Sequence, residues 1–205
     1  MKTTKLLICT VAVAAAVAAT KAQSQTLTAT LNGISPGLAV NATLDNGSFF
    51  QDYPSGVMDF AEFDAFCVEP LQSLSFGETL VYQIQSPLSL ASHDSIARLV
   101  GGYLASSRSG LDAAAVQWAI WEINAETLSS ASLLDGNVRI TTPISRDTAL
   151  LANQYLANLS SYTPVALTYL TNETRQDVVT WEVVPEPATA GLAALSGLLL
   201  LRRRR

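Results

Sequence analysis

Hydrophobic and polar residues alternate over several short segments in the first part of the chain, and this period of two predicts β-strands. The segments with this pattern are 26–31, 48–53, 63–68 and 78–84. Turn-forming residues separate them, at Asn32-Gly33, Ser35-Pro36-Gly37 and Asp45-Asn46-Gly47. We expect a strand-rich beginning in which residues 48–53 return along the chain as the second half of a hairpin.

In the middle of the chain apolar residues recur every three or four positions, which predicts helices. The predicted helices cover residues 92–107, 112–125 and 146–160, with Gly101-Gly102 as a candidate interruption of the first. Asp112 is a favourable N-cap for the second. Two strands, at about 165–170 and 178–183, close the chain. The order of elements predicts a single α+β domain with a strand-rich N-terminal part, central helices and closing β-strands.

The first 22 residues have a different pattern. Lys2 and Lys5 precede an apolar run over residues 6–19, and small residues follow as far as Ala22. This order is typical of a secretory signal peptide, and the run is short for a membrane span. We therefore expect residues 1–22 to be removed and residues 23–184 to form the exported body.

Residues 185–205 consist of three parts. Pro185, Glu186 and Pro187 come first, an apolar run over residues 188–201 follows, and the last four residues are Arg202, Arg203, Arg204 and Arg205. Fourteen apolar residues make a marginal membrane helix, which flanking residues can extend. The arginines should remain on the cytoplasmic side, so the body would face outward.

The order of these three parts closely resembles the PEP-CTERM sorting signal of Gram-negative bacteria. The resemblance implies that Pro185, Glu186 and Pro187 are the motif recognised by an exosortase, a membrane protease and transpeptidase. It further implies anchoring in the inner membrane before sorting, and then a place on the cell surface or in the extracellular matrix. Proteins of this kind typically occur in organisms that make extracellular polysaccharide. A plain tail anchor is the alternative.

Charge narrows the range of partners. Between residues 23 and 187 there are five arginines and seventeen acidic residues, which gives a net charge near −12. Nucleic acids and anionic lipids need basic patches, so we expect neither as a partner. The same interval contains no lysine, because Lys2, Lys5 and Lys21 all precede it. Arginine-biased composition is one explanation for this absence.

Two residues stand out as candidate chemistry. Cys67 has no cysteine to pair with in the exported body, since Cys9 lies in the predicted signal peptide. Gln117 lies on a very apolar predicted helix, on the same face as Ala113, Ala114, Ile120 and Trp121. A buried amide must form hydrogen bonds or destabilise the fold, so its presence there needs an explanation.

Phe66-Cys67-Val68, followed by Gln117-Trp118-Ala119-Ile120-Trp121, resembles the thioester domain of bacterial surface adhesins. The similarity covers residues 63–159, including the helix that ends in Gly102-Tyr103, and it departs from the family at Val116, where threonine is usual. It implies an internal thioester between Cys67 and Gln117 that reacts with an amine on another surface, protein or polysaccharide. It also implies that aromatic side chains exclude water from the bond, and we expect Phe63, Phe66, Trp118 and Trp121 to do so.

Other interpretations of these residues remain open. Cys67 would be an inert buried thiol or form an intermolecular disulfide if no thioester forms. His93 is the only histidine, which makes a catalytic triad or a zinc site improbable, and a lone carboxylate such as Glu122 beside Trp121 does not make a glycosidase. The sequence thus predicts no catalytic turnover, no metal and no cofactor. It predicts an exported adhesion protein, or a non-covalent polysaccharide-matrix protein of the same fold.

Overall fold

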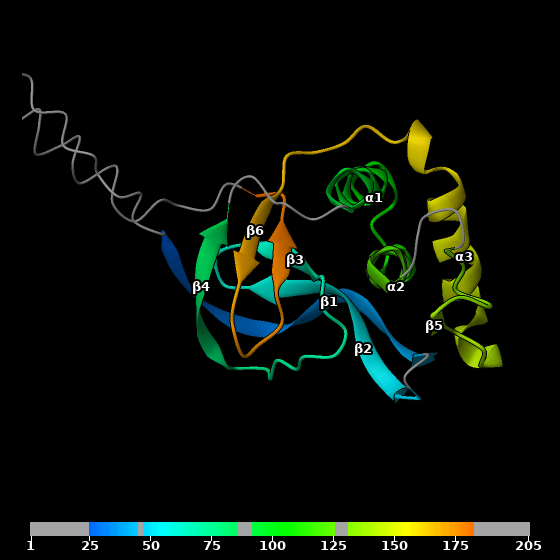
Figure 1. Ribbon diagram of the computed structural model, residues 1–205, viewed down its shortest axis with the longest axis horizontal. Coiled ribbons are helices and arrows are strands. Elements are labelled where there is room, and N and C mark those ends of the chain that lie inside the picture. Colours follow the sequence, from blue (N-terminus) through cyan, green and yellow to red (C-terminus); the bar gives the residue numbers. More distant parts are fainter. Residues whose placement is uncertain (1–24, 45–46, 86–91, 126–130, 183–205) are drawn as a thin grey trace, which may run out of the picture.

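The computed structural model describes residues 25–44, 47–85, 92–125 and 131–182 of the 205-residue chain (Figure 1). The predicted signal peptide and the predicted sorting signal lie outside these residues. Within the described residues, none of the helices has the length and apolar character that a membrane crossing requires.

Seven strands form one sheet whose pairings are all antiparallel. They are β1 (Thr26–Leu44), β2 (Phe49–Phe60), β3 (Asp64–Cys67), β4 (Thr79–Gln85), β5 (Val138–Arg139), β6 (Thr168–Thr171) and β7 (Val178–Thr180). Their order is β2-β3-β7-β6-β4-β1-β5, and β1 also pairs with β2. Because of this extra pairing, six of the strands close into a ring. Strand β5 lies outside the ring and pairs with the C-terminal end of β1.

Strand β1 is much longer than predicted, because the expected turns at residues 32–33 and 35–37 do not end it. The register with β2 shifts between Leu31 and Gly33 and again between Ile34 and Gly37, so these residues form irregularities within a continuous strand. Such bulges bend a strand. The first part of β1 pairs with β4 and the rest with β2, which is how β1 closes the ring.

Two facing glycines allow β1 and β2 to approach closely at this bend. Gly37 lies opposite Gly56, and a Cβ atom on Gly37 would be 2.7 Å from the carbonyl oxygen of Ser55. Gly56 has a φ of +150°, and a Cβ atom there would be 2.3 Å from the carbonyl oxygen of Pro36. The turn signal in the sequence therefore reflects tight strand contact.

The three predicted helices are confirmed, with small differences at their ends. They are α1 (His93–Ala105), α2 (Gly110–Ala125) and α3 (Arg146–Ala157), and two short 3₁₀ helices, η1 (Pro143–Ser145) and η2 (Leu159–Ser161), flank α3. Gly101 and Gly102 do not interrupt α1. A Cβ atom on Gly101 would be 2.0 Å from the carbonyl oxygen of Thr163, so the glycine permits close packing against that segment.

The predicted N-cap of α2 is wrong by one turn. The helix begins at Gly110, and Ser109 occupies the capping position. The Ser109 hydroxyl accepts a hydrogen bond from the Asp112 backbone N–H (3.1 Å), while the Asp112 carboxylate accepts one from the Ser109 backbone N–H (3.0 Å). This is a capping box with aspartate in the place of the usual glutamate.

Helix α2 is at the centre of the molecule. It packs against α1, α3 and the strands β1, β2 and β3, as Figure 1 shows for the helices on either side. Every residue from Asp112 to Ile123 is buried. A helix that is covered on all sides needs no polar face, which explains why its sequence is apolar all round. Gln117 is therefore an exception within a buried helix.

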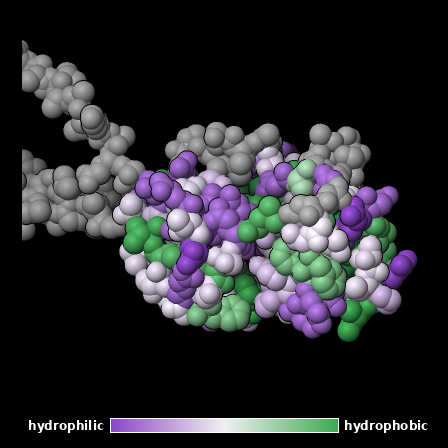
Figure 2. All heavy atoms as spheres, turned by 60° about the horizontal axis from the view of Figure 1, so that its bottom comes forward, coloured by the Kyte–Doolittle hydropathy of each residue, from purple (hydrophilic) through white to green (hydrophobic). Residues whose placement is uncertain are grey.

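The surface carries exposed apolar side chains in several separate places. Phe49, Leu71, Phe76, Val81 and Ile144 are each more than half exposed. In the face shown by Figure 2, hydrophobic groups alternate with hydrophilic ones and do not merge into one broad patch. Single exposed apolar residues of this kind are normal in folded proteins.

Candidate functional site

The strand and helix that carry the two predicted site residues meet in the core. Cys67 is the last residue of β3 and pairs with Val178 of β7. Gln117 lies in the middle of α2, which packs on β3. Both residues are buried, with 3% of Cys67 and 2% of Gln117 exposed. The structure therefore brings together two residues that are fifty positions apart in the sequence.

Two hydrogen bonds join the Gln117 side chain to the backbone of Cys67. The Cys67 N–H donates to Gln117 Oε1 (2.9 Å), and Gln117 Nε2 donates to the Cys67 carbonyl oxygen (2.7 Å). A carboxamide has the same donor and acceptor as a peptide group, so Gln117 pairs with Cys67 as a neighbouring strand would. The arrangement fixes the position and rotation of the amide beside the cysteine.

A second amide on α2 extends this contact by one residue. Asn124 Nδ2 donates to the carbonyl oxygen of Val68 (3.0 Å). Asn124 follows Gln117 by seven positions, or two helical turns, so both amides project from one face of α2. The sequence contained this signal, because both are amide side chains two turns apart on one face of a largely apolar helix.

The Cys67 thiol lies in a tight turn with Glu69. The thiol donates to the Glu69 carbonyl oxygen (3.2 Å) and accepts from the Glu69 backbone N–H (3.3 Å). Burial raises the pKa of Cys67 to about 12, and the hydrogen bond from the Glu69 backbone N–H opposes this shift only in part. Cys67 has no disulfide partner among the described residues, and its sulfur is a neutral thiol at neutral pH.

Trp121 lines the same void as Cys67 and Gln117. It lies one helical turn after Gln117, and 1% of it is exposed. Within the described part of the chain its indole N–H has no hydrogen-bond partner of ordinary geometry, yet it opposes the rise in the pKa of Cys67 by favouring the thiolate. A buried N–H without an acceptor is unusual and is directed toward the cysteine, so it is available to a group formed there.

The other predicted aromatic residues lie at different distances from the pair. Trp118 contacts Trp121, with ring centroids 4.7 Å apart, and donates its indole N–H to Ser55 Oγ (2.9 Å). Phe63 stacks on Phe60, and Phe66 contacts Tyr103 and Trp181. Because side chains alternate along a strand, Phe66 and Cys67 point to opposite sides of β3. Trp121 thus lines the void beside the pair and Trp118 packs against Trp121, whereas Phe63 and Phe66 belong to other clusters.

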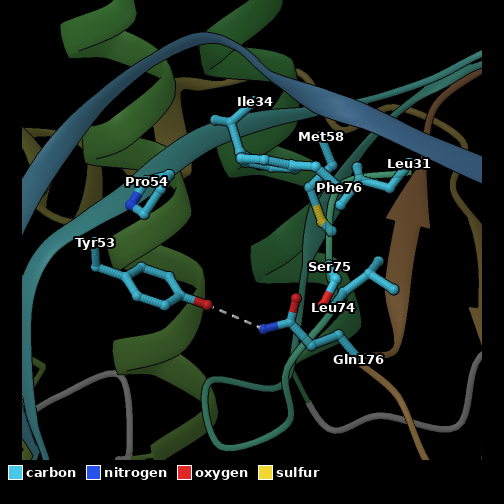
Figure 3. A pocket seen from close by; sticks show the side chains of 9 residues that line it. All are labelled: Leu31, Ile34, Tyr53, Pro54, Met58, Leu74, Ser75, Phe76 and Gln176. Atoms are coloured by element: carbon cyan, nitrogen blue, oxygen red, sulfur yellow. Dashed lines mark hydrogen bonds between the residues drawn. The ribbon is translucent and has the colours of Figure 1, made fainter. Parts of the chain in front are cut away.

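A small void lies against the pair, and a larger cavity adjoins it. The void has a volume of about 20 Å³ and is lined by Ile34, Tyr53, Pro54, Gly56, Met58, Cys67, Gln117, Trp121 and Gln176. The cavity has a volume of about 340 Å³ and is shown in Figure 3. Five residues line both spaces: Ile34, Tyr53, Pro54, Met58 and Gln176. None of these five was predicted, because their positions depend on strand pairing over long separations.

The structure gives Glu122 a structural role and places His93 at the start of a helix. Glu122 is completely buried, and its carboxylate accepts hydrogen bonds from the backbone N–H groups of Ser132 (2.8 Å) and Val138 (2.9 Å). This carboxylate therefore holds the segment after α2 and cannot contact a sugar. His93 begins α1, and its Nδ1 atom is buried without a partner. Among the described residues, no group of three or more metal-binding side chains comes together.

Comparison with known proteins adds no relative: no family model, curated protein or solved structure matches this chain. Pro185, Glu186, Pro187 and the four terminal arginines lie outside the described residues. The site is thus defined by its own geometry. It places a primary carboxamide against the backbone of a thiol-bearing residue, in a buried position next to an adjoining cavity and beside one indole N–H that has no acceptor of ordinary geometry among the described residues.

Proposed function

We propose that this protein is an exported surface or extracellular-matrix protein that attaches covalently to amines through a Cys67–Gln117 thioester. The observation that carries the proposal is the pair of hydrogen bonds between the Gln117 carboxamide and the Cys67 backbone. They hold the carboxamide beside the cysteine in one orientation. Placing one reacting group beside the residue that carries the other supplies part of the several kcal/mol that proximity can contribute to a reaction.

The bond-forming step exchanges nitrogen for sulfur at the Gln117 side chain. Cys67 Sγ attacks the Gln117 carbonyl carbon, the C–N bond breaks, and the thiol proton leaves with the amide nitrogen as ammonia. The products are a thioester and one ammonia, with no oxidant or reductant. During the attack, negative charge develops on Oε1, where the Cys67 N–H already donates at 2.9 Å. That N–H would act as an oxyanion donor.

The surroundings suit the preservation of such a bond. Cys67 and Gln117 are buried, and Trp121, which Trp118 packs against, lines the void beside them. Water excluded from the site cannot hydrolyse a thioester. The same burial raises the pKa of the free thiol. The Cys67 sulfur therefore leaves the thioester readily only if it takes up a proton as it leaves. These features favour slow, single-use chemistry over catalytic turnover.

An external primary amine would complete the reaction. The amine nitrogen attacks the thioester carbonyl, an amide forms at Gln117, and the thiol of Cys67 is released with the proton from the amine. The exported body has no lysine, so copies of the protein would not join one another through lysine side chains. An amine on another protein, a polysaccharide or a host surface is the proposed target.

The proposed route to the surface rests on the two ends of the chain. Residues 1–22 would direct export, and residues 185–205 would act as a PEP-CTERM signal that an exosortase recognises in the inner membrane. Substituting Pro185, Glu186 and Pro187 together should leave the protein in the membrane fraction instead of at the surface. Unchanged release would argue against this signal and in favour of a plain tail anchor.

Thiol release tests the proposed reaction. The purified protein should show no thiol before treatment and should show one after treatment with methylamine, while Gln117→Ala should show a thiol throughout. A reactive thiol in denatured wild-type protein before methylamine treatment would exclude the thioester.

A non-covalent matrix protein of the same fold is the second candidate. The observation that favours it is that both ends of the Gln117 amide already have hydrogen bonds, as a purely structural glutamine would. In that case Gln117 anchors α2 to β3, and Cys67 is a buried apolar residue. Untreated protein would then contain a free thiol, which the same experiment detects.

A further inference from the structure

The cavity beside the site has a mainly apolar wall without charged residues. Its walls consist mainly of the apolar side chains Leu31, Ile34, Pro54, Met58, Leu74 and Phe76. Three further residues complete the lining: Tyr53, Ser75 and Gln176. No lining residue carries a charge, although the exported body is strongly acidic.

The inner end of this cavity leads toward the Cys67–Gln117 pair. The five residues that line both the cavity and the void form the boundary between them. Tyr53 and Gln176 reach toward one another from opposite sides of that boundary, as Figure 3 shows. Gln176 Nε2 donates to the Tyr53 hydroxyl oxygen, over a long distance of 3.3 Å.

This hydrogen bond is weak enough to open. A distance of 3.3 Å lies beyond the usual range for such bonds. Gln176 is 3% exposed, and the bond joins side chains rather than backbone groups, so a rotation of either side chain separates them without disturbing the sheet. The void beside the pair holds only about 20 Å³, which is little more than one water needs, so an alkylamine requires more room than this, and movement of Tyr53 or Gln176 would supply it.

We propose that the cavity is the entrance for the attacking amine and that Tyr53 and Gln176 form its gate. The inference rests on the proposed thioester for the identity of the reaction, but the route to Cys67 is independent of it. The occupant is an unbranched aliphatic primary amine. Its methylene groups contact the apolar wall, and its nitrogen passes between Tyr53 and Gln176.

The wall chemistry sets the selectivity. An uncharged lining offers no partner to a carboxylate, and burying an unpaired charge is strongly unfavourable. Butylamine should therefore react faster than 4-aminobutyrate, which carries an added negative charge, by about tenfold or more. A bulky branched group next to nitrogen needs a wider opening than a straight chain does, so butylamine should also react faster than tert-butylamine.

Two substitutions open the gate in different ways. Gln176→Ala removes the side chain, and Tyr53→Phe removes only the hydroxyl that accepts the hydrogen bond. Both should raise the rate of butylamine addition several-fold, and Gln176→Ala should also reduce the preference for butylamine over tert-butylamine. Tyr155→Phe is the matched control, since it removes a tyrosine hydroxyl that donates to Asp112 away from the cavity. It should leave both rates unchanged.

A thiol reagent tests the route without the thioester. Gln117→Ala provides a free Cys67, which straight-chain and branched alkyl methanethiosulfonates convert to mixed disulfides. Adding Gln176→Ala to this protein should accelerate labelling and bring the two reagents closer in rate. If Gln176→Ala accelerates labelling but the wild type adds no amine, the entrance stands and the thioester is contradicted. Labelling and amine addition that do not respond to either gate substitution would overturn the entrance.

Discussion

The Gln117 side chain and the Cys67 backbone form a closed pair of hydrogen bonds, with donor–acceptor distances of 2.9 and 2.7 Å. The pair joins the central helix to the end of β3, at a place where the strand needs a partner on the side opposite β7. Gln117 thus has a definite structural role whether or not a thioester forms. The proposed chemistry uses the same contact.

Replacing Gln117 with leucine should destabilise the protein measurably. The side chain keeps a similar size, but the N–H and C=O groups of Cys67 lose their partner within the core. Each unsatisfied buried group costs about 1–3 kcal/mol. Urea denaturation should show a loss of this order in the free energy of unfolding. Asn124→Leu is the control: it removes a hydrogen bond to Val68 on the same face of α2, but should not alter thiol release by methylamine.

A free thiol at residue 67 should make the free energy of unfolding fall at alkaline pH. The folded pKa is about 12 and the ordinary value is 9.0, so the folded state keeps its proton while the unfolded state loses it. Stability is therefore complete below pH 9 and falls as the pH rises toward 12, by up to about 1.4 kcal/mol per pH unit. Gln117→Leu, which keeps a free thiol, should show this fall relative to the double variant with Cys67→Ala. Parallel curves would contradict the burial of a protonated thiol.

The capping box at α2 should make Asp112 sensitive to acid. Burial alone would raise the pKa of Asp112, but hydrogen bonds from Ser107, Ser109 and Tyr155 hold it below the ordinary value of 3.8. A lowered folded pKa contributes stability above pH 3.8 that is lost as the pH falls through the folded value. Asp112→Asn should cost about 1–2 kcal/mol at pH 7, measured by urea denaturation, and should remove this part of the acid dependence. An unchanged acid profile would be inconsistent with these contacts.

Glu122 should contribute strongly to stability although it takes no part in the proposed reaction. Its two oxygens accept from the N–H groups of Ser132 and Val138 in the segment that follows α2. Glu122→Gln replaces one acceptor with an NH₂ group that faces a donor, and should cost about 1–3 kcal/mol in thermal or urea denaturation. Methylamine-dependent thiol release should persist in the folded variant. A loss of release without a loss of folding would place Glu122 in the reacting site.

Sequence patterns predicted the order of elements well, because the period of hydrophobic residues is a local signal. The three helices and most strands arise from such local signals. The long course of β1 could not be predicted, since glycine and proline at residues 33–37 indicate a turn and a strand bulge equally well. The two residues of β5 are too few for any pattern to mark.

The site was predictable only in part for the same reason. Cys67 and Gln117 stood out as polar chemistry in apolar segments, and the resemblance to thioester domains linked them. Tyr53 and Gln176 had no such signal, because they meet only after β2 and the segment before β7 close the ring. For Phe66 the sequence misled: it is adjacent to Cys67, but side chains alternate along a strand, so Phe66 points to the other side of β3.

Intact mass of the exported protein, purified without exposure to amines, tests the central claim most directly. Once the termini are identified by peptide sequencing, the account predicts a mass lower than that of the sequence by one ammonia. Cys67→Ala and Gln117→Ala should each abolish this deficit, and methylamine should convert the wild type to an adduct at Gln117. A wild-type mass equal to that of its sequence, with Cys67 present as a free thiol, would contradict the thioester.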